Sequence, residues 1–214
     1  MKKKLLAVTV ALLAGSAFGA PALAAENPED QVGIQHNMYL GCLMDLNTSP
    51  SDALTVLVKK CGYDPGMPLE RFVATQQPIV DSIDPTKPMA ESLAGLRPQF
   101  SAYEFSFIER MDQIVQNTGD VDAAALQFEE LEREAIGRLD PKSKNGALIL
   151  GGLSVAKHST RYWSEYVSRN GNSTAKAFPW KILLVVAADA LGYILTQNIS
   201  ISSAVSNTVQ GWLD

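Results

Sequence analysis

Apolar side chains recur at three- and four-residue steps along much of the chain, and this spacing predicts helices. Residues 28–46 show the pattern first, and residues 100–117 and 120–139 show it most regularly. In each segment the apolar positions form one stripe that would face a core, while polar side chains occupy the remaining surface. The three stripes are Val32, His36, Tyr39, Leu43 and Leu46; Phe100, Tyr103, Phe107, Met111 and Ile114; and Ala124, Phe128, Leu131, Ala135 and Leu139.

Turn-forming residues separate these helices from their neighbours. Ser49-Pro50 predicts the start of a second helix, with the serine as N-cap, and Gly62 predicts its stop. A third helix over 69–83 contains Pro78 and should be broken or bent there. The prolines of residues 84–98 predict a connector with one short helical turn. We expect this connector to mark a boundary between two lobes.

Two later segments are apolar on more than one side. A helix expected to open at Asp140-Pro141 carries bulky residues around its circumference, which predicts burial. Residues 178–195 are apolar all round but short, and Asp189 lies among them. A central acid costs about 2.5–3.5 kcal/mol in a bilayer, so a buried core helix is favoured over a spanning one. The tail that follows fits an amphipathic helix, although residues 199–202 also alternate like a strand.

Together these patterns predict an all-α fold. We expect an irregular multi-helix bundle of about six to eight helices, with the apolar C-terminal helix in its core. Residues 25–214, with a chain that is 46% hydrophobic, suffice for one helical domain.

Residues 1–24 are predicted to be a cleavable signal peptide. Three lysines precede the apolar run 5–14, and Ala22-Leu23-Ala24 supplies a small-residue cleavage site. The run is too short to cross a bilayer, which takes roughly 20 residues. We therefore expect cleavage near Ala24 and a periplasmic or secreted mature protein.

The two cysteines gain significance from this expected location. Cys42 lies in the first predicted helix and Cys61 ends the second. Outside the cytoplasm such a pair is typically oxidised, so we expect a disulfide that ties the N-terminal helical hairpin. A bridge closing a loop of this length stabilises a fold by about 3 kcal/mol.

Charge restricts the classes of partner. Loss of the three signal-peptide lysines lowers the net charge from −5 to −8. Such a surface repels phosphates, so no nucleic-acid partner is expected. We expect an unknown protein or a small apolar ligand instead, and contact with a membrane at its surface at most.

The helix predicted over 120–139 also carries paired charges and an acidic run. Glu129 with Arg133, and Glu134 with Arg138, have the acid-before-base spacing that supports a helix. The run from Glu129 to Glu132 is expected to be a solvated helix face rather than a metal site.

Motifs of known chemistry are absent from the sequence. The two histidines, His36 and His158, lack a second metal-type ligand at a recognised spacing. Neither a phosphate-binding loop nor a Gly-x-Ser-x-Gly motif occurs. We therefore assign no catalytic residue, and we expect neither metal nor cofactor.

A candidate polar site comprises His36, Asn37 and Asp189. His36 lies on an inner helix face and Asp189 lies in the most apolar helix, where an unpaired carboxylate would be costly. Asp189 should therefore have a partner such as His36, His158, Lys181 or Arg161. We favour a structural contact, in which Asp189 fixes the position of the last helix. A functional role for this carboxylate remains the alternative.

Two short motifs resemble a loose set of uncharacterised exported bacterial helical proteins. They are Val32-Gly33-x-x-His36-Asn37-x-x-Leu40 near the start, and Trp180-Lys181 with Ala188-Asp189-Ala190-x-Gly192 near the end. The resemblance covers only the ends of the chain. It implies that His36, Asn37 and Asp189 belong to one place in the fold, and it implies no activity.

The helical body, the aromatic C-terminal segment and the missing motifs favour an exported, non-enzymatic binding protein. An inhibitor or immunity-type protein would fit this description. Its interaction surface is expected at Trp180, Tyr193 and Trp212.

Two alternative functions remain open at this point. In the first, the apolar helix 178–195 inserts into lipid and the protein is membrane-active or envelope-associated. In the second, the protein is a hydrolase that uses His36 and Asp189, which requires both side chains to reach one substrate.

Overall fold

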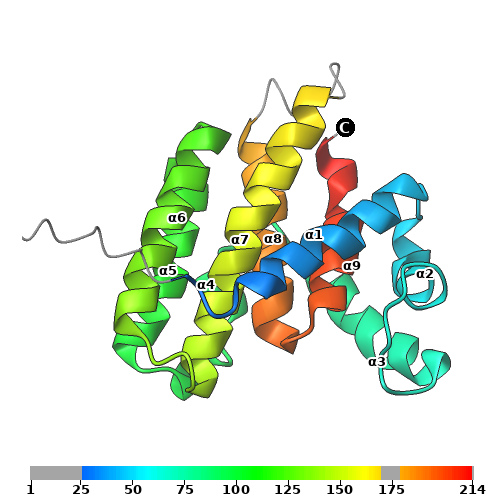
Figure 1. Cartoon of the computed structure of the whole chain (residues 1–214), viewed down its shortest axis with the longest axis horizontal. Helices are drawn as coiled ribbons and strands as arrows, with labels where there is room; N and C mark the ends of the chain where they lie inside the picture. The colour runs from blue at the N-terminus through cyan, green and yellow to red at the C-terminus, as the bar shows by residue number, and fades with distance from the viewer. Residues whose placement is uncertain (1–25, 170–178, 214) are drawn as a thin grey trace, which may run out of the picture.

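The computed structural model describes residues 26–169 and 179–213, and in this part the chain forms helices joined by turns, with no strand (Figure 1). The expected signal peptide lies outside the described residues. The predicted all-α fold is confirmed. In chain order the α-helices are α1 (Asp30–Asp45), α2 (Ala53–Lys59), α3 (Leu69–Ser82), α4 (Met89–Ser92), α5 (Ala102–Asn117), α6 (Val121–Arg138), α7 (Lys144–Arg169), α8 (Pro179–Thr196) and α9 (Ile199–Val209).

Helix α7 is the centre of the bundle, with contacts to α1, α6 and α8 (Figure 1). Helix α8 packs between α7 and α9, and α1 lies across α7 and α9 on the outside. The α5–α6 pair stands on one side of this centre, and α2 and α3 stand on the other. Helices from both ends of the chain therefore share one core.

The helix starts follow local hydrogen bonding. Asp120 caps α6 as predicted, since its carboxylate accepts the Ala123 N–H. The prediction that the Ser49 side chain caps a backbone N–H is wrong. Its hydroxyl donates to the Asp52 carboxylate, and the first turn, Pro50–Asp52, is a 3-10 helix that leads into α2.

Helix α7 begins later than the Asp140-Pro141 start that the sequence suggested. The Asp140 carboxylate accepts the Lys142 N–H, and the Ser143 hydroxyl accepts the Gly146 N–H. These bonds form a turn before the first helical residue, Lys144. Helix α3, by contrast, continues through Pro78 without a break.

The connector 84–98 contains the short helical turn that its sequence predicted, α4. Its residues Met89 and Leu93 are buried in the same apolar core as the rest of the chain. Asp112 of α5 caps this turn by accepting the N–H groups of Met89 and Ala90. Burial raises the pKa of Asp112, although these two bonds oppose the rise.

The predicted stripe of α6 is confirmed, because all five of its apolar residues are buried. Two members of the other stripes are wrongly placed: Tyr103 and Leu46 are half exposed. Both lie close to a helix end, where the wheel pattern constrains a side chain least.

The charge pairs expected along α6 are replaced by pairs between helices. Glu134 forms a bidentate pair with Arg110 of α5, and Glu129 pairs with Arg161 of α7. The Arg110 fork on the neighbouring helix thus competes successfully for Glu134 against Arg138, which lies one turn away.

The C-terminal apolar segment is a buried core helix, as predicted. The described side chains of α8 from Ile182 to Ile194 are nearly all buried. Among residues 26–169 and 179–213, no helix has both the length and the apolarity of a membrane span. The tail at 199–202 belongs to helix α9, so the alternative strand is wrong.

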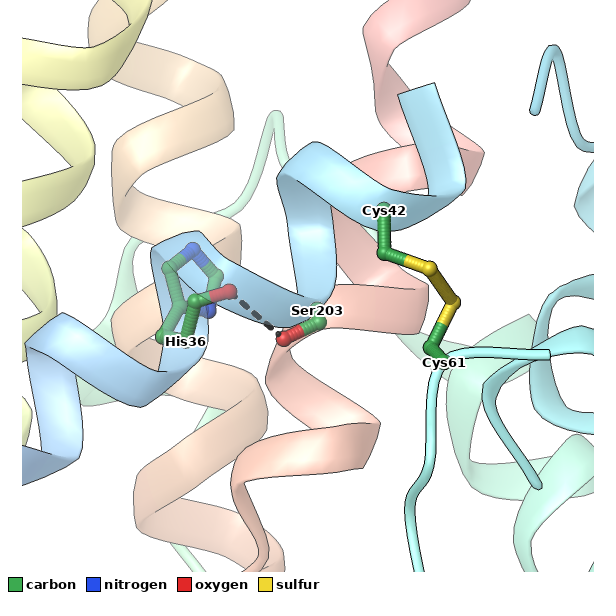
Figure 2. Close-up of a disulfide and its surroundings, with 4 residues drawn as sticks. All are labelled: His36, Cys42, Cys61 and Ser203. Atoms are coloured by element: carbon green, nitrogen blue, oxygen red, sulfur yellow. Dashed lines mark hydrogen bonds between the residues drawn. A yellow bond between two sulfur atoms is a disulfide. The ribbon is translucent and has the colours of Figure 1, made fainter. Parts of the chain in front are cut away.

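The predicted disulfide joins Cys42 of α1 to Cys61 just beyond α2, with Cα atoms 5.9 Å apart (Figure 2). Gly62 follows with a φ of +76°, a left-handed conformation that suits glycine. The N-terminal helical hairpin is therefore closed covalently.

Candidate functional site

His36 and Asp189 meet in the middle of the core. The His36 Nε2 lies 3.4 Å from the Asp189 Oδ2, and both side chains are fully buried. His36 arrives on the inner face of α1, and Asp189 arrives from α8 between two alanines. The small neighbours let α8 approach closely. Of the four partners proposed for Asp189, the structure selects His36.

Serines from two helices complete the carboxylate's surroundings. The Asp189 Oδ2 accepts hydrogen bonds from Ser159 of α7 at 2.5 Å and from Ser206 of α9 at 2.9 Å. Both serines are fully buried. Three helices therefore converge on one carboxylate oxygen.

Two further serines of α9 hold His36. The Ser202 hydroxyl lies 2.9 Å from the His36 Nδ1 and donates its proton to the Asp189 backbone carbonyl at 2.6 Å. Because the hydroxyl has only one proton, the His36 Nδ1 must carry the proton of the contact between Ser202 and His36. Ser203 donates to the His36 backbone carbonyl at 3.1 Å (Figure 2). The spacing of apolar residues gave no sign of these serines, although four serines on one short helix were a signal.

Ser202, His36 and Asp189 thus have the residue types of a catalytic triad, but their arrangement does not activate the serine. Its proton is directed to a carbonyl, whereas a triad histidine accepts that proton. None of the described cavities is lined by any of the three residues. In this conformation the cluster joins α1, α7, α8 and α9, and its three side chains are fully buried.

Asn37 does not join the pair, contrary to what the resemblance implied. Its side-chain amide donates to the His158 carbonyl of α7 at 2.9 Å. Consecutive residues on a helix point about 100° apart, so His36 faces the core while Asn37 faces the α7 edge.

The aromatic residues expected at an interaction surface are not together. Trp180 is half exposed at the start of α8. Tyr193 is buried against Gly151, where a Cβ atom would lie 2.4 Å from its ring. Burial raises the pKa of Tyr193 to about 12. The Trp212 side chain lies outside the described part of the structure.

A second polar cluster, missed by the sequence analysis, surrounds Lys157 of α7. The Lys157 ammonium contacts the Asp30 carboxylate at 2.6 Å and the Glu132 carboxylate at 2.7 Å. Asn27 donates to Glu132 at 2.6 Å, and His158 contacts Asp30 at 2.9 Å. Glu132 is 6% exposed, so the prediction that the acidic run is a solvated face is wrong for this residue. The lysine lies 25 residues away and gave no local signal.

The charges of this cluster stabilise one another. Burial opposes ionisation of Asp30, but hydrogen bonds and charge from Lys157 and His158 outweigh it and lower the pKa of Asp30. Burial also opposes protonation of Lys157, but hydrogen bonds to Asp30 and Glu132 outweigh it and raise the pKa of Lys157.

Two open grooves lie near the ends of α1. The Lys157 groove, about 660 Å³, is lined by the segment before α1, by the first turn of α1, by α6 and by α7. The Asp45 groove, about 640 Å³, is lined by the C-terminal parts of α1, α7 and α9. Both walls combine charged and apolar groups. Within the described residues no group of three histidine, cysteine, aspartate or glutamate side chains is placed to hold a metal ion.

Acid should lower the stability of the folded protein by protonating Asp30. Its folded pKa lies below the unfolded value of 3.8, so its contribution is complete above pH 3.8 and is lost as pH falls from there through the folded pKa. Urea unfolding between pH 7 and pH 2 should show a smaller acid-induced loss for Asp30→Asn than for the wild type. Asp81→Asn, at an exposed carboxylate of α3, should keep the wild-type profile. Equal losses for all three proteins would contradict the assignment.

Comparison with known proteins returned no matching family model, no matching curated protein and no matching solved structure.

Proposed function

We propose that this chain is an exported binding protein, of the inhibitor or immunity type, which holds a partner protein against the outer face of α1. The observation that carries the proposal is the pair of open grooves at the two ends of this helix. The polar residues with catalytic chemistry, His36 and Asp189, lie instead beneath α1 and stabilise its attachment.

The exposed positions of α1 form a ridge between the two grooves. Ile34 and Met38, one turn apart, are 42% and 55% exposed. Gln31 of the same helix lines the Lys157 groove and Asp45 lines the Asp45 groove. An apolar centre with a charged rim is the usual anatomy of a protein interface. The core beneath keeps this ridge rigid, which limits the entropy lost on binding.

Export is part of the proposal and has two supports. The lysine, apolar and Ala-x-Ala segments of residues 1–24 have the order of a secretory signal. The bridge between Cys42 and Cys61 is typical of proteins outside the cytoplasm. The mature chain is therefore proposed to act in the periplasm or outside the cell.

Photo-cross-linking tests the proposed face. A photoreactive residue placed at Met38 should capture a discrete partner from the exported fraction of the source cells. The same residue at Met67, which is 40% exposed in the loop before α3, is the matched control and should not. Met38→Glu should weaken capture by an affinity-tagged chain about ten-fold, with Met67→Glu unchanged. Capture that is equal at both positions, or absent from both, would refute the proposal.

A hydrolase is the second candidate, because Ser202, His36 and Asp189 do lie in contact. That activity requires α9 to move and expose them. A fluorophosphonate probe distinguishes the two candidates, since it labels an activated serine. Labelling that is lost in Ser202→Ala but kept in Ser203→Ala would favour the hydrolase. An unlabelled wild-type protein would eliminate it.

A further inference from the structure

The Asp45 groove has an unusual position in the fold, because α1 and α7 end at it and α9 passes there into the 3-10 helix Gln210–Leu213. Its walls come from the last turn of α1, the last turns of α7 and the end of α9. The lining residues that matter for its chemistry are Asp45, Tyr162, Glu165, Tyr166 and Arg169.

Helix ends give this groove a negative potential. The C-terminus of a helix carries a partial negative charge from carbonyl groups without intrahelical partners. Neither α1 nor α9 has a basic residue in its last turn to offset this charge. Helix α7 has one, Arg169, but its guanidinium pairs with Glu165 of the same helix. The dipoles therefore add in the groove.

Asp45 strengthens this potential. It is the last residue of α1, where a carboxylate is unfavourable for the helix itself. Within the part of the chain that the structure describes, the Asp45 carboxylate forms no hydrogen bond or ion pair. An exposed carboxylate in this position is available to a ligand, and its cost to the helix would be relieved by a bound cation.

Aromatic rings form the wall beside Asp45. Tyr162 and Tyr166 flank the buried Trp163, each with its ring centre 5.3 Å from the tryptophan's. Burial, with the charge of Asp45 as a further cause, raises the pKa of Tyr162 to about 12. Tyr162 is thus a neutral ring at physiological pH, close enough to Asp45 to sense its charge. A carboxylate beside aromatic rings is the combination that binds alkylammonium and guanidinium groups.

We propose that the Asp45 groove binds an organic cation, either an alkylammonium or a guanidinium group. Asp45 and the helix ends supply the attraction, and the tyrosine rings contact the apolar part of the cation. The inference rests on the proposed binding function and specifies the ligand chemistry of one groove. The cation has two sources, a free small molecule or a lysine or arginine side chain of the partner.

Titrations followed by NMR test the site on the full mature chain. Choline should shift the amide signals of residues 45 and 162. Its uncharged isostere 3,3-dimethylbutanol should bind about ten-fold more weakly, because it lacks the charge but has the same shape. Added salt should weaken the binding of choline and leave the binding of the isostere unchanged. Isostere binding as tight as choline would overturn the proposal.

Variants locate the site and separate it from the cross-linking result. Asp45→Asn and Tyr162→Leu should each weaken choline binding several-fold, while Asp81→Asn should not. Tighter binding of a blocked arginine peptide than of choline would assign the partner's side chain, and the reverse would assign a free cation. Unchanged binding in Asp45→Asn, or no binding of either probe, would overturn the cation site. Partner capture at Met38 would then still support the broader binding function.

Discussion

Replacing Asp189 with alanine should lower the free energy of unfolding by about 3–5 kcal/mol, the cost of removing one partner from a buried pair. The substitution removes the carboxylate beside the His36 imidazole and leaves the hydroxyls of Ser159 and Ser206 without their shared acceptor. Urea denaturation monitored by tryptophan fluorescence measures the change. Most single substitutions cost far less, so a loss of this size identifies a network.

A double-mutant cycle shows whether the pair itself is responsible. His36→Leu and Asp189→Leu should each destabilise strongly, and the double variant should lose less than the sum, because neither polar group is then left alone. Asp81→Ala, at an exposed carboxylate, should change the stability by no more than about 0.5 kcal/mol. Additive losses in the cycle would show that His36 and Asp189 are not coupled.

Replacing Lys157 with methionine should cost about 3 kcal/mol or more at pH 7. Methionine retains the length of the apolar stem but removes the ammonium, so Glu132 remains buried with only the Asn27 amide to solvate it. Asp30, one-third exposed, retains water and His158 and should suffer less. Equilibrium denaturation of both proteins across a pH series is the measurement.

The pH dependence separates lost charge from lost packing. Asp30 loses its charge as pH falls below 3.8 through its lowered pKa, and its attraction to Lys157 is lost with it, so the gap between Lys157→Met and the wild type should narrow there. A packing defect would persist at every pH. Arg138→Met, which removes an exposed cation from α6, is the matched control and should show a small gap throughout. A constant gap for Lys157→Met would contradict the electrostatic explanation.

The helices and their order were predictable because each carries its own periodic signal. The stripe from Ala124 to Leu139 could be recognised without tertiary information, because five apolar residues on one face of a helix indicate that this face is buried. The burial of residues 178–195 followed from their apolar composition, and the Cys42–Cys61 bridge followed from there being only two cysteines.

The polar sites were predictable only in part. A histidine and an aspartate on apolar faces signalled that each needs a partner, and the structure joins them. Lys157 gave no such signal, because a lysine in a long helix usually extends into solvent. Its burial depends on Glu132 and Asp30, which lie 25 and 127 residues away. Such separations carry no trace in local spacing.

The close contact of α1 with α7 has a similar origin. A Cβ atom at Gly33 would lie 2.4 Å from the Ser154 carbonyl oxygen, and the Gly33 N–H donates to the Ser154 hydroxyl. The sequence showed a glycine inside a helix, which by itself suggests only a weak point. The close approach of the α7 backbone is what requires a glycine at this position.

The contact between His36 and Ser202 spans 166 residues and sets an order of events for the newly made chain. The first described helix cannot bury its histidine until the last one has been synthesised and, if the chain is exported, has crossed the membrane. Until then α1 must remain undocked, with its apolar stripe accessible to chaperones and proteases. Contacts of this length slow folding, because a large loop must close before they form. A chain truncated before α9 should accordingly be degraded rather than accumulate as a smaller folded protein.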